Sequence, residues 1–214
     1  MKNRSEKLRR SVLMAMMAAI AYLIVSYIRI PVVLFLKYEP KDVIIVTGGF
    51  LLGPGAAVIS SVLVALLEMF TISDTGPIGC LMNALSTCSF ALTASLIYKK
   101  KHTLAGAGIG LAAGSIAMIA VMLLWNWAIT PLYMKVPRSV VEDMLLPVFL
   151  PFNAVKAGLN SGLTLALYKP LVSALNKARL LPTPSATKGK PNIWVYATAA
   201  VLLAVSIALL LWLI

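Results

Sequence analysis

The sequence contains few acidic residues and few of the side chains that enzymes use for catalysis. Its 214 residues include 7 Asp and Glu, one histidine and two cysteines. His102 adjoins a lysine run, and Cys80 and Cys88 lie eight residues apart in one apolar segment, so neither arrangement has the spacing of a metal site or a redox pair. No Ser/His/Asp set or paired catalytic carboxylates can be assembled. A Gly-x-x-x-x-Gly-Lys-Ser/Thr phosphate loop is also missing, which excludes ATP hydrolysis by that route. We therefore predict a protein that is not an enzyme and that uses no catalytic cofactor or metal.

Hydrophobic residues make up 60% of the chain and charged residues only 12%, which indicates an integral membrane protein. The formal net charge of +12 would suggest nucleic-acid binding in a soluble protein. Here the basic residues cluster beside apolar runs, where they set topology and contact lipid headgroups. We expect the lipid bilayer, and no nucleic acid, as a partner.

Seven apolar segments are candidates for membrane helices, and most can cross a core roughly 30 Å thick at about 1.5 Å per residue. They cover about 11–28, 42–53, 55–72, 78–98, 104–130, 146–176 and 193–214. The second segment is short and could be re-entrant or tilted, since it ends at Gly53-Pro-Gly. The basic N-terminus and the Lys99–Lys101 loop should both be cytoplasmic, which requires an even number of crossings between them. Four crossings satisfy this requirement and three do not.

We therefore expect an all-α membrane protein. A six-helix bundle covers residues 1–178, a cytoplasmic linker 179–192, and an additional C-terminal transmembrane helix 193–214. This topology places 13 of the 19 basic residues inside and leaves Lys156 within the membrane, so the N-terminus is cytoplasmic and the C-terminus extracellular. The long outer loop 29–41 has the position of a lid. Five basic residues are assigned to the outside: Arg29, Lys37, Lys41, Lys135 and Arg138.

Lys156 lies in an otherwise apolar helix, where a charge costs roughly 2.5–3.5 kcal/mol or more. Asn153 three residues before it and Asn160 four after it share its helical face. This polar stripe indicates a binding site inside the membrane. The alternative is an interhelical hydrogen-bond ladder that only holds the bundle together.

Other helices supply groups that could converge with this stripe to form an amphipathic pocket. Aromatic rings offer stacking surfaces, and asparagine amides both donate and accept, which suits a planar heterocycle with alternating carbonyl and N–H groups. The two tryptophans could instead belong to an interfacial aromatic belt. The candidates are Asn83, Trp125, Asn126, Trp127, Thr130 and Phe152.

Three acids lie near this region. Glu68 is a candidate substrate contact, a counter-charge to Lys156, or a solvated interfacial acid. Glu39 and Asp42 adjoin a helix start, where capping is a simpler explanation than substrate binding.

Ala15 and Ala19, four residues apart in the first helix, form a smooth surface that another helix could approach closely. This pattern suggests docking on a partner. Packing within the molecule is the alternative.

Several of these motifs together resemble the riboflavin-specific substrate-binding (S) component of energy-coupling-factor transporters. The match covers about residues 8–178 and includes the basic N-terminus and the alanine-lined first helix. The remaining motifs are Leu36-Lys-Tyr-Glu-Pro-Lys-Asp, Gly48-Gly-Phe-Leu-Leu-Gly-Pro-Gly, Trp125-Asn-Trp and Pro151-Phe-Asn-Ala-Val-Lys. The resemblance implies six helices in a bacterial cell membrane that hold the vitamin near the outer side, partly covered by the first external loop. A transmembrane coupling protein (T component) and two ATPase subunits would drive import.

Carried over to this sequence, the resemblance makes Asn126, Asn153 and Lys156 flavin-binding residues and Ala15 and Ala19 the docking surface for the coupling protein. The C-terminal helix departs from the usual six. An S component for another vitamin, such as thiamin or biotin, is the alternative within the same class. A small intramembrane lipid enzyme that uses Lys156 with Glu68 is the alternative from another class.

Overall fold

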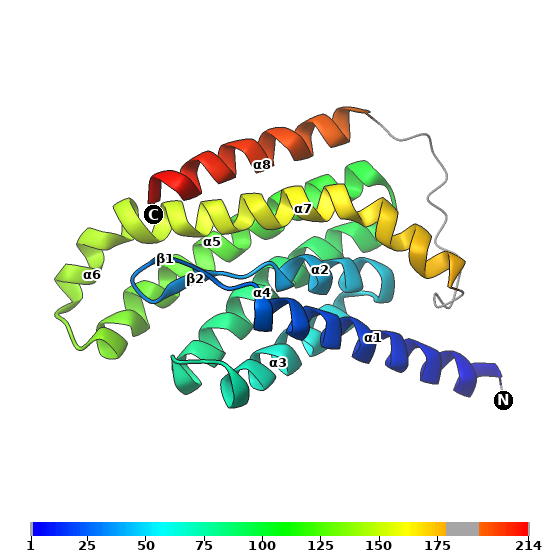
Figure 1. The fold of residues 1–214 in the computed structure, drawn as a ribbon, viewed down its shortest axis with the longest axis horizontal. Coiled ribbons are helices and arrows are strands. Elements are labelled where there is room, and N and C mark those ends of the chain that lie inside the picture. The colour runs from blue at the N-terminus through cyan, green and yellow to red at the C-terminus, as the bar shows by residue number, and fades with distance from the viewer. Residues whose placement is uncertain (1, 179–192, 214) are drawn as a thin grey trace.

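The computed structural model describes residues 2–178 and 193–213. The chain forms a bundle of long helices with a two-stranded hairpin at one end (Figure 1). The elements in order are α1 (Lys2–Tyr27), β1 (Ile30–Val33), β2 (Leu36–Tyr38), α2 (Lys41–Leu52), α3 (Pro54–Thr71), α4 (Gly76–Lys100), α5 (Leu104–Met134), α6 (Arg138–Met144), the π-helical turn η1 (Leu145–Phe149), α7 (Leu150–Lys177) and α8 (Ile193–Leu213). The predicted all-α membrane fold is confirmed. The predicted linker 179–192 lies outside the described residues.

Within residues 2–178 and 193–213, five helices are long and apolar enough to cross a membrane: α1 from Glu6, α3, α4, α5, and α8 from Tyr196. The 28 residues of α7 would also suffice in length, but this helix carries the polar stripe. With 12 residues, α2 rises only about 18 Å. Ten of those residues are buried among α1, α3, α4 and α7, so α2 is an interior helix of the bundle.

Local sequence explains where the helices begin and end. Gly53, at φ +93°, ends α2 in a conformation that only glycine adopts easily, and Pro54 then starts α3. Thr103 caps α5 by accepting a hydrogen bond from the backbone N–H of Gly106 at 3.0 Å. Before α7, the N–H of Leu150 bonds to the carbonyl of Leu145, five residues back, which makes η1 a π-turn.

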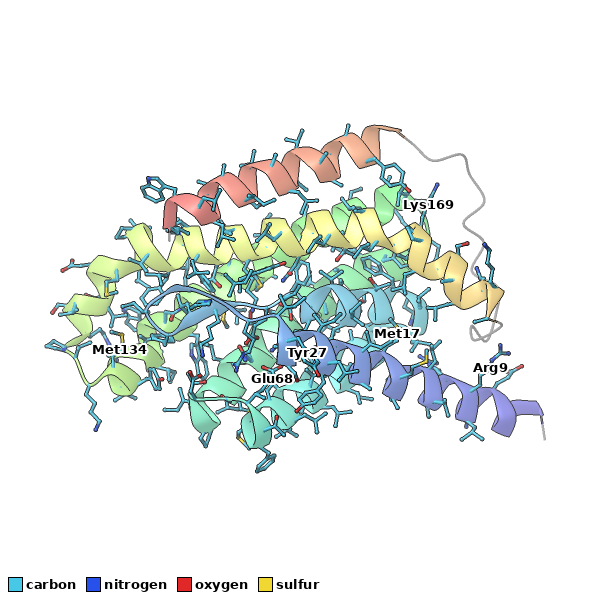
Figure 2. The ribbon with its side chains drawn as sticks, in the orientation of Figure 1. Arg9, Met17, Tyr27, Glu68, Met134 and Lys169 are labelled. Atoms are coloured by element: carbon cyan, nitrogen blue, oxygen red, sulfur yellow. The ribbon has the colours of Figure 1, made fainter. Side chains whose placement is uncertain are left out.

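Small residues bring the helices close together. A Cβ added at Gly110 or Gly114 of α5 would lie 2.6 Å from a backbone oxygen of α4, so α4 and α5 meet backbone to backbone there. In α1, Ala18 and Ala21 are buried in the core. Figure 2 shows the side chain of Met17 beside α2 and that of Glu68 inside the bundle, whereas Tyr27 lies at the surface.

The outer loop 29–41 is more ordered than the sequence predicted. Strands β1 and β2 pair antiparallel, with Ile30 opposite Tyr38 and an irregularity between Pro31 and Val33. Leu34 turns the chain at φ +53°. In Figure 1 this hairpin lies at the end of the long axis where α8 ends, and α1 begins at the opposite end.

Candidate functional site

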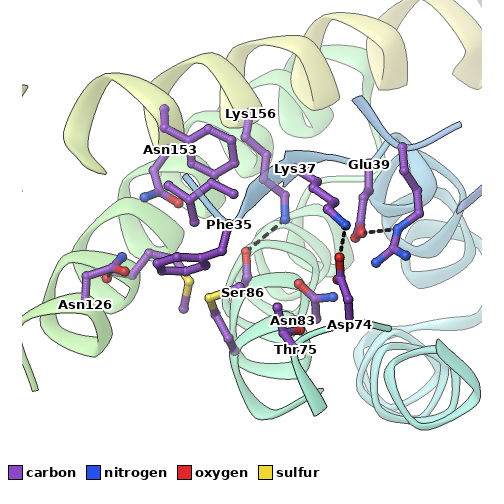
Figure 3. A pocket seen from close by; sticks show the side chains of 15 residues that line it. Phe35, Lys37, Glu39, Asp74, Thr75, Asn83, Ser86, Asn126, Asn153 and Lys156 are labelled. Carbon is purple, nitrogen blue, oxygen red and sulfur yellow. Dashed lines mark hydrogen bonds and ion pairs between the residues drawn. The ribbon is translucent and has the colours of Figure 1, made fainter. Parts of the chain in front are cut away.

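A pocket lies at the hairpin end of the bundle, where side chains from the hairpin, α4, α5 and α7 converge (Figure 3). The space between its walls is about 500 Å3, part of which is open to solvent. Its wall combines amides, charged groups and aromatic rings. The main polar contributors are Lys37, Glu39, Asn83, Ser86, Asn126, Asn153 and Lys156. The apolar contributors include Phe35, Leu36, Met82, Met122 and Phe152.

Two buried asparagines of the pocket are oriented by their own helices. Asn153 Nδ2 donates to the carbonyl of Phe149 in the π-turn at 2.8 Å. Asn126 Nδ2 donates to the carbonyl of Met122 at 2.7 Å, and its Oδ1 accepts from the hydroxyl of Thr130 at 2.9 Å. Fixed amides of this kind present donors and acceptors without a further loss of side-chain freedom on binding.

Lys156 lines the same pocket and is 4% exposed. It is the seventh residue of α7 and therefore lies near the hairpin end of that helix. Its Nζ lies 3.3 Å from Ser86 Oγ and 3.6 Å from Asp42 Oδ2. Of the three alternatives for Glu68, the counter-charge to Lys156 does not hold, because Glu68 pairs with Lys41 and Asp42 of α2 lies beside Lys156.

Asp42 and Asn160 lie behind the pocket wall. Asp42 is fully buried and accepts hydrogen bonds from Thr87 Oγ1 at 2.7 Å and Asn160 Nδ2 at 3.0 Å. Asn160 Oδ1 accepts from the hydroxyl of Tyr38 at 3.1 Å. The predicted stripe therefore divides: Asn153 and Lys156 face the pocket, whereas Asn160 connects α7 to α2 and to the hairpin.

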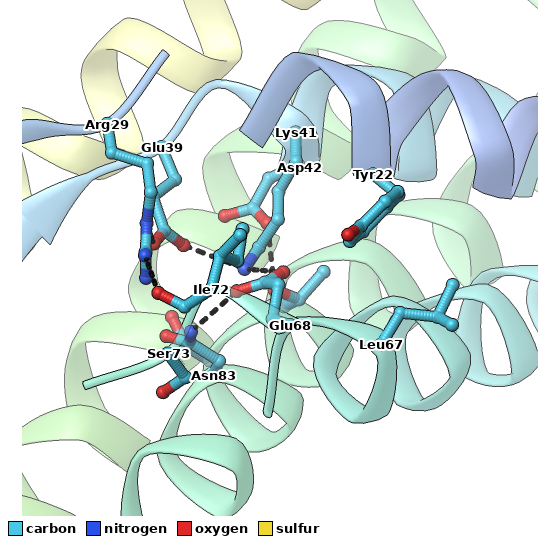
Figure 4. A network of polar contacts seen from close by, with 12 residues as sticks. Tyr22, Arg29, Glu39, Lys41, Asp42, Leu67, Glu68, Ile72, Ser73 and Asn83 are labelled. Carbon is cyan, nitrogen blue, oxygen red and sulfur yellow. Dashed lines mark hydrogen bonds and ion pairs between the residues drawn. The ribbon is translucent and has the colours of Figure 1, made fainter. Parts of the chain in front are cut away.

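A second buried ionic network, shown in Figure 4, surrounds Lys41. The ammonium of Lys41, which is 1% exposed, bonds to Glu39 at 2.7 Å and to Glu68. Asn83 Nδ2 donates to Glu68 at 3.0 Å, and the guanidinium of Arg29 bonds to Glu39 at 3.1 Å. The sequence assigned Lys41 to the outside and left a solvated interfacial position as one alternative for Glu68, but both side chains are buried.

The same network corrects the capping interpretation of Glu39 and Asp42. The start of α2 has no capping hydrogen bond from a side chain. Burial by itself would raise the pKa of Glu39, but the positive charges of Lys41, Lys156 and Arg29 outweigh it and hold the pKa well below its ordinary range. Glu39 is therefore a buried carboxylate at the edge of the pocket.

Residues 9–168 match the family model described as ECF transporter, substrate-specific component. The chain belongs to this family. The match covers every residue that lines the pocket and ends within α7, before α8. The chain is thus the substrate-specific (S) component of a membrane transporter, which agrees with its apolar helices.

Two relatives refine this assignment. A curated protein named riboflavin transporter RibU, from Staphylococcus aureus (strain TCH60), is 27% identical over 179 residues, which are 79% of this chain and 93% of that protein. A solved structure titled as the S component of a bacterial ECF transporter superposes with a TM-score of 0.67 at 29% identity. That match covers 98% of the solved chain and 79% of this S component, so about a fifth of this chain lies outside it.

The remaining predicted site residues lie around the pocket rather than in it. Trp125 and Thr130 line a second cavity of about 230 Å3, which shares Phe35 and Met82 with the main pocket. Trp127 points away from both cavities. It is 41% exposed, its indole N–H donates to Glu142 at 2.9 Å, and Arg138 lies 4.6 Å from its ring centroid. The interfacial alternative fits Trp127, whereas Trp125 belongs to the apolar cavity.

The sequence predicted that loop 29–41 covers the site, but it did not assign Phe35, Leu36 or Lys37 of this loop to the wall of the pocket. Phe35 at the hairpin tip lines both cavities and packs edge-on against Tyr133, with ring centroids 5.0 Å apart. Lys37 bridges to Asp74 in the α3–α4 turn at 2.5 Å. The alternation of residues in the loop was the available signal, but two strands of three and four residues are too short to give a distinct pattern.

Proposed function

We propose that this S component binds riboflavin in the pocket beneath the hairpin and presents it for import. The observation that carries the proposal is the wall built from Asn126, Asn153 and Lys156, in a chain similar to a protein named riboflavin transporter RibU. Two oriented amides and one ammonium suit the pyrimidine-like edge of an isoalloxazine ring, which alternates carbonyl and N–H groups. Phe35 and Phe152 offer apolar surface for the rings.

The charge balance of the site favours a neutral ligand. Lys156 is accompanied by the carboxylates of Asp42 at 3.6 Å and Glu39 at the pocket edge. The ammonium can therefore donate to a ring carbonyl or a ribityl hydroxyl without requiring an anionic ligand. Riboflavin, which has no phosphate, meets this condition.

Energy for import would come from other subunits, namely a transmembrane coupling protein and two ATPases. Ala15 and Ala19 lie on the exposed face of α1, opposite the buried Ala18 and Ala21, and this position supports α1 as the docking surface. We place the hairpin end at the extracellular side, so that the N-terminus is cytoplasmic and the C-terminus extracellular. The basic residues predicted to face inward support this orientation.

Purification tests the proposal directly. The protein extracted in detergent should be yellow, with a flavin absorption spectrum, or should bind added riboflavin with quenching of the flavin fluorescence. Equilibrium titration against riboflavin, thiamin and biotin should rank riboflavin first by several orders of magnitude. Preferred binding of thiamin or biotin would replace riboflavin as the substrate and keep the transport class.

A further inference from the structure

Helix α8 lies along α7 in close contact, outside the region that matches the family model (Figure 1). Gly158 and Gly162, one turn apart on α7, face α8. A Cβ at Gly158 would lie 2.1 Å from Ser206 Oγ, and one at Gly162 would lie 2.8 Å from Leu203 Cγ. Glycines four residues apart let two membrane helices approach closely. We call this contact, formed by Gly158 and Gly162 of α7 with Leu203 and Ser206 of α8, the seam. It holds α8 against the helix that carries Lys156.

Beyond the seam, α8 reaches the hairpin. Leu210, which is 9% exposed, packs in one apolar cluster with Tyr38 of β2 and with Val155 and Leu159 of α7. Val32 of β1 packs against the same cluster. The end of α8 therefore contacts β1 and α7, and it shares one apolar cluster with Tyr38 of β2.

Tyr38 connects this cluster to the pocket. Its hydroxyl donates to Asn160 Oδ1 at 3.1 Å, and Asn160 Nδ2 donates to Asp42 at 3.0 Å. Asp42 in turn pairs with Lys156 at 3.6 Å. Burial raises the pKa of Tyr38 above its ordinary value, so the phenol stays protonated and remains a donor. Displacement of the Tyr38 ring would weaken the packing of the hairpin against α7 and α8. It would also weaken the chain of polar contacts that ends at Lys156.

We propose that α8 is a positioning element, with Leu210 as its contact residue, that holds the hairpin over the pocket and slows release of the ligand. The role in ligand release rests on the proposed function, whereas the role in holding the hairpin does not. α8 thus acts on the binding site from outside the matched region.

Two neighbouring leucines of α8 provide a matched test in the full chain. Leu210 lies in the cluster and Leu211 is 71% exposed, so Leu210→Ala and Leu211→Ala make the same change at a buried and at an exposed position of the helix. In lipid nanodiscs without vitamin, amide hydrogen exchange of residues 30–38 should be faster in Leu210→Ala than in wild type and unchanged in Leu211→Ala. Riboflavin should also dissociate about three- to tenfold faster from Leu210→Ala alone, since truncating a packed leucine loosens its cluster.

Two further variants keep the test decisive if Leu210→Ala folds poorly. Leu210→Met keeps the volume of the side chain and should restore both readouts. Gly162→Leu should wedge α8 away from α7 and reproduce the faster hairpin exchange. Equal hairpin exchange in all variants would overturn the positioning role. Faster exchange in Leu210→Ala together with no riboflavin binding by wild type would overturn the proposed ligand and retain the role of α8 in holding the hairpin.

Discussion

The chain buries two lysines near the hairpin, and their surroundings differ. Lys41 is 1% exposed and bonds directly to the carboxylates of Glu39 and Glu68. Lys156 is 4% exposed, with a hydroxyl at 3.3 Å and a carboxylate at 3.6 Å as partners, and it lines the pocket. An ammonium enclosed by two carboxylates holds helices together, whereas a loosely paired one keeps hydrogen bonds for a ligand. We therefore propose a structural role for Lys41 and a ligand-binding role for Lys156.

Replacing Lys41 by methionine should have the largest effect. The change takes the ammonium away from two buried carboxylates, which leaves Glu39 with Arg29 and Glu68 with the amide of Asn83. Removing one partner of a buried ion pair costs about 3–5 kcal/mol. We expect a large fall in the thermal unfolding temperature measured in detergent. Lys100→Met, at the exposed end of α4, should leave that temperature unchanged. Adding Glu68→Gln to Lys41→Met should recover part of the loss, because it removes one of the two carboxylate charges, and no recovery would argue against the ion-pair explanation.

Lys156→Met should instead weaken ligand binding. A hydrogen bond from a charged donor contributes about 1.5–3 kcal/mol, which corresponds to roughly 10- to 100-fold in affinity. Stability should fall less than in Lys41→Met, since Asp42 still accepts hydrogen bonds from Thr87 and Asn160. Riboflavin titration and thermal unfolding of both variants measure the contrast. Unchanged affinity with a loss of stability as large as that of Lys41→Met would make both lysines structural.

The contrast between the lysines also marks what sequence can predict. Predicted segments 55–72 and 78–98 agree closely with α3 and α4, because long apolar runs and the Gly53-Pro and Gly76-Pro boundaries are local signals. Helical spacing likewise placed Asn153 and Lys156 on one face. The burial of Lys41 was missed, because its partner Glu68 lies 27 residues away on another helix. Asn160 was assigned to the pocket because helical spacing shows which side chains share a face of α7. Spacing does not show that Asp42 of α2, which is 118 residues from Asn160 in the sequence, covers part of that face.

Thr130→Val should have a smaller effect than Lys156→Met, and it acts through Asn126. The hydroxyl of Thr130 donates to Asn126 Oδ1 at 2.9 Å, and valine keeps the shape of the side chain but removes this donor. The amide of Asn126 then has more freedom, and we expect riboflavin affinity to fall about threefold. Thr47→Val removes a buried hydroxyl that bonds only within α2, to the carbonyl of Val43, so it serves as the matched control. Equal affinity losses in the two variants would show that the effect does not depend on Asn126.

Lys37→Met completes the series with the smallest expected effect. Lys37 pairs with Asp74 at 2.5 Å across the pocket rim, but the side chains are 26% and 64% exposed. Exposed ion pairs contribute about 0–1 kcal/mol, and a middle value of about 0.5 kcal/mol corresponds to a roughly twofold faster dissociation of riboflavin. The Debye length falls from about 10 Å at 0.1 M salt to about 3 Å at 1 M, so wild type in 1 M salt should release riboflavin at the rate of the variant. Lys156 is shielded from solvent, and the ratio between wild type and Lys156→Met should therefore persist in the same salt. If 1 M salt left the release rate of wild type unchanged, water would be excluded from the Lys37–Asp74 pair. The hairpin would then close the pocket more tightly than the exposure of Asp74 indicates.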